Sequence, residues 1–70
     1  MSKLQERRKA AGLSQSQLAA RISMSVRTLQ HLERGSLDIN KAAALTVYRL
    51  ARELDCDVVD LLELPDPEAE

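Results

Sequence analysis

The chain has 70 residues, with two Gly, two Pro, one Tyr, no Phe and no Trp, and its formal net charge is −1 at pH 7. A chain of this length forms one domain with a small core, which self-association would help to stabilise. Leu and Ala are the commonest apolar residues and favour helices, whereas strands would require more β-branched and aromatic residues. We therefore expect an all-α domain.

The composition also argues against several function classes. The single Cys56 excludes an internal disulfide bond and a cysteine-rich zinc site, and we expect it to be a small buried hydrophobe rather than a redox sensor. One His, no cluster at metal-ligand spacing and no glycine-rich phosphate loop give no support for an enzyme. We expect no metal, no cofactor and no small-molecule ligand. The charged N-terminus and the lack of a long apolar run predict a cytoplasmic protein without a membrane segment.

The charge is unevenly distributed along the chain. Residues 1–35 contain seven Lys or Arg against two Glu, a net +5, whereas residues 36–70 contain three against nine Asp or Glu, a net −6. Such asymmetry is expected of a domain that turns one face toward phosphate, although solvated helix surfaces would also produce it.

The first predicted helix runs from about Ser2 to Ala11 and ends at Gly12. Leu4 lies on one face of it, two turns before Ala11. Leu13 then precedes the next helix, where an apolar residue can pack back on the first turn as a hydrophobic staple.

The next two predicted helices, Gln15–Ile22 and Val26–Arg34, are short and are joined by a tight turn. Each begins behind a serine, Ser14 or Ser25, whose hydroxyl can accept a hydrogen bond from an unpaired amide of the first turn. Gly35 can adopt the left-handed conformation that ends a helix. Two helices joined in this way form a helix-turn-helix, which places its second helix in the DNA major groove. Apolar residues at helical spacing are expected to hold the pair together: Leu18, Ala19, Ile22, Met24, Leu29 and Leu32.

A longer helix is predicted from about Lys41 to Leu54, with Asp38 or Asn40 as its cap. Leu45 and Tyr48 lie on a second apolar face of this helix. The expected inward positions are Ala43, Thr46 or Val47, Leu50 and Leu54.

A last helix is predicted from about Val58 to Leu64, behind Asp57 and before Pro65, which ends it. The domain would then cover residues 1–64. Residues 65–70 form an acidic, proline-containing tail that we expect to be disordered.

Three segments, RKAAGLSQSQLAARI, SMSVRTLQHLERG and AAALTVYRLARELDCDVVDLLE, keep apolar, small and polar positions in the register GLSQ..LA....S..T...LE.G. They resemble the lambda-repressor/Cro-like, or XRE-type, helix-turn-helix regulators over about residues 3–64. The resemblance implies a compact five-helix domain and a sequence-specific transcription regulator, a repressor of bacterial or phage type. The family usually has Gly where Ser23 stands, and a left-handed Ser there would cost roughly 1–2 kcal/mol.

The third helix matches the family at the positions that contact bases. Arg27 can donate two hydrogen bonds to guanine O6 and N7, and Val26 can meet a thymine methyl. Gln30 can pair with adenine N6 and N7 or reach a phosphate, and His31 can donate to or accept from a purine. The alternative for each is a solvated helix surface, and for His31 also a partly buried imidazole.

Phosphate contacts are expected around the start of the second helix. Gln15 lies where free amides and the positive end of the helix dipole favour a phosphate oxygen, and the family uses Gln there to contact the DNA backbone. Further candidates are Ser14, Thr28, Arg21 and Arg34. The resemblance also implies a structural ion pair between Arg8 and Glu33.

Two recognition helices read more base pairs than one, so we expect a homodimer, formed either in solution or only on DNA, that spans half-sites about 34 Å apart. Candidate interface residues are Leu45, Tyr48, Val58, Leu61 and Leu62, unless these complete the core. A protein-interaction module, such as an antitoxin-like component whose acidic half binds a partner protein, is the alternative to a DNA-binding regulator.

Overall fold

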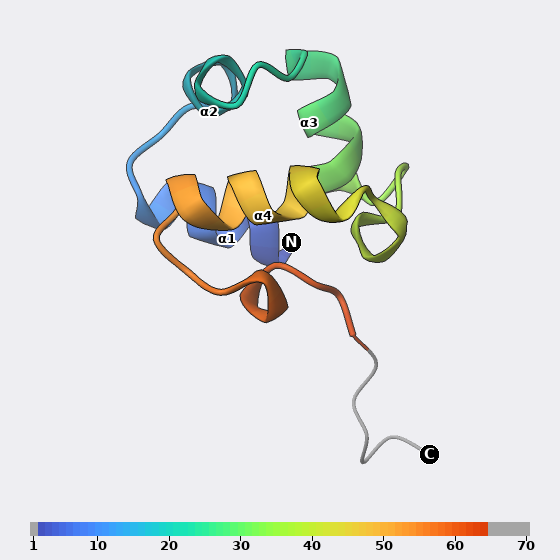
Figure 1. Ribbon diagram of the computed structural model, residues 1–70. Helices are drawn as coiled ribbons and strands as arrows, with labels where there is room; N and C mark the ends of the chain where they lie inside the picture. The colour runs from blue at the N-terminus through green and yellow to red at the C-terminus, as the bar shows by residue number, and fades with distance from the viewer. Residues whose placement is uncertain (1, 65–70) are drawn as a thin grey trace.

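A computed structural model describes residues 2–64, which form a helical unit without a strand (Figure 1). In Figure 1, α2 and α3 lie above α4, and the segment that follows α4 passes below it. The all-α prediction is confirmed for these residues, but four α-helices and two 3₁₀ turns replace the five predicted α-helices. The elements are α1 (Lys3–Ala10), α2 (Gln15–Arg21), α3 (Val26–Arg34), η1 (Ile39–Lys41), α4 (Ala44–Glu53) and η2 (Val58–Asp60).

α2 and α3 begin as predicted, behind Ser14 and Ser25, and α1 begins at Lys3, one residue later than predicted, with Ser2 as its cap. Ser2, Ser14 and Ser25 each accept a hydrogen bond from the amide three residues further along, at 3.0 or 3.1 Å. These bonds satisfy amides that the helix itself leaves unpaired. α3 has the predicted bounds and ends at Gly35, whose φ of 87° is left-handed. α2 ends at Arg21, one residue earlier than predicted.

The turn between α2 and α3 is held by the backbone. Ser23 has a φ of 57°, the left-handed conformation that an L-residue adopts at a cost of about 1 kcal/mol. The next amide, that of Met24, donates to the carbonyl of Ala19 at 2.9 Å. Met24 is half-buried and packs against the core, so its side chain helps to hold this strained turn in place.

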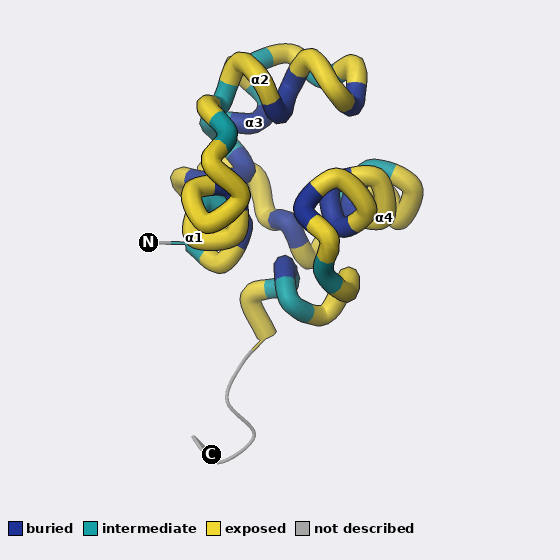
Figure 2. The backbone as a smooth tube through the Cα atoms, turned by 90° about the vertical axis from the view of Figure 1, so that its left-hand side faces the viewer, coloured by how far each residue is buried: buried dark blue, intermediate teal, exposed yellow. Residues whose placement is uncertain are grey.

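The core lies between the four α-helices and the last segment, and Figure 2 shows buried stretches on each of these elements. In α4, the expected Val47, Leu50 and Leu54 are buried, but Ala43 is exposed because it precedes the first turn. The buried apolar residues are Leu4, Leu18, Ala19, Ile22, Leu29, Leu32, Ile39, Val47, Leu50, Ala51, Leu54 and Leu61.

The predicted start of the long helix at Lys41 is wrong. Asp38 does act as a cap, but its carboxylate accepts from the amide of Asn40 at 2.9 Å and closes the short η1 turn. Ala42 then takes an extended conformation, with a ψ of 156°, which interrupts the helical path. The α-helix therefore begins only at Ala44.

The predicted helix over residues 58–64 is also wrong, because only η2 forms there. The side chain of Asn40 makes two hydrogen bonds to the backbone of Glu63, both at 2.9 Å. Its Nδ2 donates to the Glu63 carbonyl, and its Oδ1 accepts from the Glu63 amide. These two bonds hold the chain in a non-helical path after η2. Asp57 does precede this element, and its backbone amide donates to the Asp60 carboxylate at 3.0 Å. Pro65 and the predicted tail lie outside the described residues.

Candidate nucleic-acid interface

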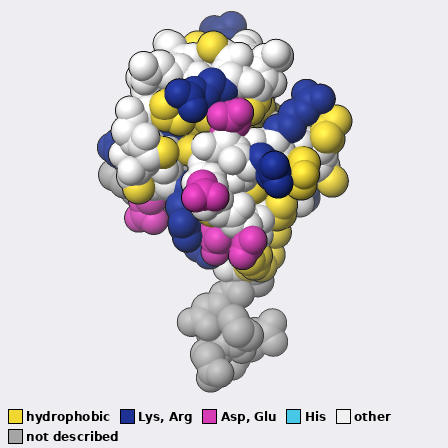
Figure 3. All heavy atoms as spheres, turned by 60° about the vertical axis from the view of Figure 1, so that its left-hand side comes forward, with side chains coloured by type: hydrophobic (Ala, Val, Ile, Leu, Met, Phe, Trp, Pro, Cys, Tyr) yellow, Lys and Arg dark blue, Asp and Glu magenta, His cyan; other side chains and the backbone are white. Residues whose placement is uncertain are grey.

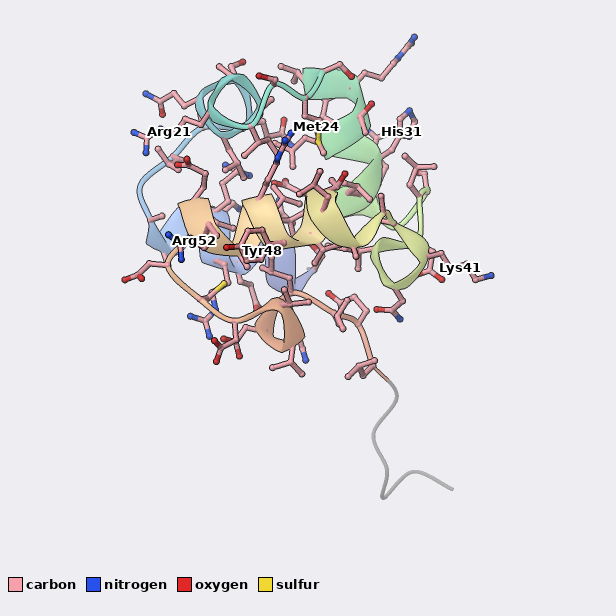
Figure 4. All side chains as sticks on the ribbon, in the orientation of Figure 1. Arg21, Met24, His31, Lys41, Tyr48 and Arg52 are labelled. Carbon is pink, nitrogen blue, oxygen red and sulfur yellow. The ribbon has the colours of Figure 1, made fainter. Side chains whose placement is uncertain are left out.

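Helical spacing determines which side of α3 faces outward. Leu29, Leu32 and Glu33 are buried against the other helices, so the residues between them project from the molecule. Arg27 is exposed, and His31 is half-buried at the edge of the fold, pointing away from α4 in Figure 4. We define the α3 outer face by Val26, Arg27, Gln30, His31 and Arg34.

The charges that α3 exposes are all positive. Arg27 and Arg34 have no acidic partner within 4.0 Å among residues 2–64, and Glu33, the acid of this helix, is buried. On α1, by contrast, Arg7 is 3.6 Å from the carboxylate of Asp60. Within residues 2–64, no carboxylate lies within ion-pair distance of these two guanidinium groups, so this surface can attract phosphate.

Arg8 and Glu33 form a buried ion pair between α1 and α3. The Arg8 Nε donates to Glu33 Oε2 at 2.6 Å and a terminal nitrogen donates to Oε1 at 3.2 Å. The other terminal nitrogen donates to the carbonyl of Leu13 at 2.9 Å. Only 9% of the Arg8 side chain and 3% of the Glu33 side chain are exposed. Removal of one partner from such a pair costs about 3 kcal/mol, so this contact fixes α3 on α1.

Gln15 joins this ion pair to the α3 outer face. Its Nε2 donates to Glu33 Oε1 at 3.0 Å, and its Oε1 accepts from Gln30 Nε2 at 3.3 Å. Gln15 and Gln30 therefore touch each other, although the sequence suggested separate roles for them. The three side chains line a shallow groove together with Gln5 and Arg34. Sequence reasoning missed the Gln15–Gln30 contact and the presence of Gln5 in this groove, because no local pattern links residues so far apart.

The two other polar residues proposed for phosphate contact lie in the helix caps. Ser14 accepts from the Gln17 amide, and its own amide donates to the Gln17 side chain at 2.8 Å. Thr28 receives a hydrogen bond from the Ser25 hydroxyl at 2.8 Å. Each hydroxyl accepts in these bonds, so each keeps its own proton for a further acceptor.

Arg21 does not join this group. It lies 3.6 Å from the carboxylate of Glu53, at the end of α4. Figure 4 shows it on the side of the molecule opposite His31. Figure 3 views the molecule from nearer that side, where Lys and Arg side chains alternate with Asp and Glu, and His31 is not visible there.

A different surface covers α4 and η2. Leu45 and Tyr48 are 58% and 51% exposed, and Val58 and Val59 lie exposed on η2. We call these four residues the α4–η2 apolar face. Arg52 lies over the Tyr48 ring, 6.0 Å from its centre.

Two residues expected in a dimer interface do not lie on this apolar face. Leu61 has no exposed surface and belongs to the core, so its prediction as an interface residue is wrong. Leu62 is half-buried and packs against the same core. The chain after η2 turns both side chains inward, which the amphipathic pattern of a longer helix did not predict.

Comparison with known families agrees with this geometry. A family model described as Helix-turn-helix matches residues 4–61, from α1 to the residue after η2. The chain belongs to the lambda-repressor/Cro-like, or XRE-type, helix-turn-helix family. It is a DNA-binding family, so this helix-turn-helix chain is a DNA-binding regulator in general terms. No curated protein matches the chain significantly.

No helix within the described residues is long and apolar enough to cross a membrane. Among the same residues, no group of three or more His, Cys, Asp or Glu side chains could hold a metal ion.

Proposed function

We propose that the protein is a sequence-specific regulator that inserts α3 into the major groove of double-stranded DNA and represses transcription by occupying its site. One observation carries this proposal: α3 exposes Arg27 and Arg34 while its acid, Glu33, is buried and paired. An interaction surface for a basic protein would not expose cations there. A major groove has negative potential and offers acceptors for these donors.

Base reading falls to the α3 outer face in this proposal. Arg27 is exposed and its guanidinium matches guanine O6 and N7. His31 can meet a purine N7 through either ring nitrogen. Val26 packs partly against the core, so only part of its side chain is available for a thymine methyl.

Phosphate contacts surround the base-reading residues. Gln15, Ser14 and Thr28 are proposed to donate to phosphate oxygens, and Arg34 adds a charge beside the same groove. These contacts position α3 without reading sequence. Arg21 is left out, since it is close to Glu53 and lies on the other side of the molecule.

Dimerisation on DNA would supply the second recognition helix. The α4–η2 apolar face provides exposed Leu45 and Tyr48 for a contact between two copies. A chain of 70 residues reads few base pairs alone, and a symmetric dimer would read half-sites about 34 Å apart.

The test is selection of bound duplexes from a random pool, followed by titrations at several salt concentrations. We expect one enriched motif with two related halves, and affinity for it that falls steeply with salt. The absence of any enriched motif would contradict sequence-specific binding.

The alternative is a protein-interaction module. Exposed Val58 and Val59 on η2 beside the acidic Asp55 and Asp57 would suit a basic partner with an apolar patch. The same selection separates the two functions, because a module without DNA specificity enriches no sequence.

A further inference from the structure

We propose that a groove between the end of α2 and α4 binds the phosphate groups of a small molecule. The groove has a volume of about 400 Å³, which is within the range of small-molecule sites. It lies on the side where Figure 4 shows Arg21, Tyr48 and Arg52, away from His31, and it does not depend on the proposed function of α3. We define the arginine groove by six of its lining residues: Arg21, Ser23, Tyr48, Arg49, Arg52 and Glu53.

The arginine groove carries more positive than negative charge. Arg49 and Arg52 have no acidic partner within 4.0 Å among residues 2–64. Arg21 lies 3.6 Å from the Glu53 carboxylate, beyond the usual range of an N–H···O hydrogen bond, so its guanidinium donors remain available. Three guanidinium groups and one carboxylate give the groove a net charge of +2. Guanidinium groups bind phosphate oxygens in pairs, so an anion of this kind fits the groove.

The strained backbone at Ser23 is an independent reason to assign a ligand here. Its φ of 57° is left-handed, a conformation that glycine adopts without the steric penalty of a side chain. Residues strained in this way concentrate at functional sites. The Ser23 side chain is exposed and lines the arginine groove, where its hydroxyl can donate to a phosphate oxygen. The hydroxyl is the group that glycine would lack at this position.

Tyr48 favours a nucleotide over a free polyphosphate as the ligand. Its side chain is 51% exposed, and Arg52 lies over its ring, 6.0 Å from the centre. Figure 4 shows these two side chains next to each other on α4. A planar base can stack on an exposed aromatic ring or on a guanidinium plane. Since Tyr48 also belongs to the α4–η2 apolar face, a nucleotide and a second copy would compete for this ring.

The experiment is a nuclear magnetic resonance titration of the ¹⁵N-labelled protein, without DNA or Mg²⁺ and at physiological ionic strength. The two probes are ATP and inorganic triphosphate, which share the phosphate chain and differ in the nucleoside. We expect both probes to shift the signals of Arg21, Ser23 and Arg49 in a saturable way. ATP should bind more tightly, and it alone should shift the Tyr48 ring protons.

A pair of charge-matched double variants separates the groove from general attraction of anions. Arg21→Gln with Arg49→Gln should lower affinity for both probes about tenfold or more, because charged hydrogen bonds to phosphate are lost. Arg27→Gln with Arg34→Gln removes the same charge outside the groove and should change these affinities by less than about twofold. Circular dichroism of each variant verifies folding. Arg49→Gln alone replaces the first double variant if that one does not fold.

Two further positions test the individual contacts. Ser23→Ala keeps the backbone strain and removes the hydroxyl, whereas Ser23→Gly removes both. Each should lower affinity for both probes roughly fivefold, although only Ser23→Gly should stabilise the fold. Tyr48→Leu should reduce the affinity for ATP to that for triphosphate.

Contrary outcomes are distinct for each part of the proposal. The phosphate site is overturned if neither probe causes a saturable shift, or if the two double variants lose affinity equally. Groove signals that shift with a short DNA duplex but with neither probe would also overturn it and would indicate a second DNA segment. Equal affinities for ATP and triphosphate would overturn the role of Tyr48 and indicate an inorganic polyphosphate. Unchanged affinities in both Ser23 variants would overturn the role of that hydroxyl.

Discussion

The α3 outer face and the α4–η2 apolar face differ in both charge and anchoring. On α3, the exposed charges are Arg27 and Arg34, which have no ion-pair partner within residues 2–64, and the buried Arg8–Glu33 pair fixes the helix from behind. On α4, apolar Leu45 and Tyr48 are exposed, and the nearby charges include acids as well as bases. A surface that reads DNA requires fixed donors, whereas a surface that pairs with another copy requires area to bury. The proposed DNA contact and the proposed contact between two copies would therefore use separate faces.

The largest expected effect comes from breaking the anchor of the α3 outer face. Glu33→Ala leaves the buried guanidinium of Arg8 without its partner, which should cost about 3 kcal/mol of unfolding free energy. For a domain of this size the melting temperature should fall by more than about 10 °C. Thermal unfolding followed by circular dichroism measures this. Arg27→Ala, as the exposed control, should melt close to the wild type, and a larger shift for Arg27→Ala would contradict the structural role of the pair.

Arg27→Ala tests whether the α3 outer face reads bases. Loss of a bidentate guanine contact should weaken binding to the selected duplex by about 1–3 kcal/mol, with a smaller loss on random duplex. Fluorescence anisotropy with both duplexes measures the two losses. The matched control is Arg49→Ala, an exposed arginine of α4 without an ion pair among the described residues. Equal losses for cognate and random duplex would count against base reading by Arg27.

Leu45→Glu should break the apolar face while leaving the α3 outer face intact. A charge in a contact between two copies should lower affinity for a duplex with two half-sites by about 1–2 kcal/mol, because the buried leucine surface is lost. Binding to a single half-site should not change. Native mass measurement on DNA should then detect one copy per duplex instead of two. A wild type that already binds as one copy would refute the dimer.

Ser23→Gly tests the turn between α2 and α3, which belongs to neither face. Glycine adopts a φ of 57° without the steric penalty of a side chain, so the substitution should stabilise the fold by about 1 kcal/mol. Urea denaturation measures the change, and DNA affinity should remain the same. Destabilisation would mean that the Ser23 side chain makes a contribution beyond its backbone strain.

The smallest effect concerns Cys56, which lines a groove beside Tyr48 and Val58. Burial raises the pKa of the Cys56 thiol, so less thiolate is present at pH 8 than in an exposed cysteine. Alkylation at pH 8 should therefore be several-fold slower in the folded protein than in urea. A further decrease with the selected duplex would place a second copy over this face. Equal rates in folded and unfolded protein would contradict the burial.

Local chemistry made the first half of the chain predictable. Ser2, Ser14 and Ser25 each bond to an amide three residues away, so the starts of the helices are decided within one turn. Gly35 ends α3 because glycine readily adopts the left-handed backbone conformation found there. The second half was predicted less well because its element boundaries depend on Asn40 and Glu63, which lie 23 residues apart and bond through the fold.

The helix-turn-helix and the outward side of α3 could be predicted from the sequence, because caps and helical spacing act over a few residues. The family could be predicted from the register of its motif. Only the tertiary structure decided that Leu61 is in the core, that Arg21 lies beside Glu53, and that Gln15 reaches Gln30. Each of these depends on how separate elements pack. The spacing of apolar residues indicates which side of a helix is buried, but it does not indicate which distant side chains contact that side. Those contacts depend on how the elements pack.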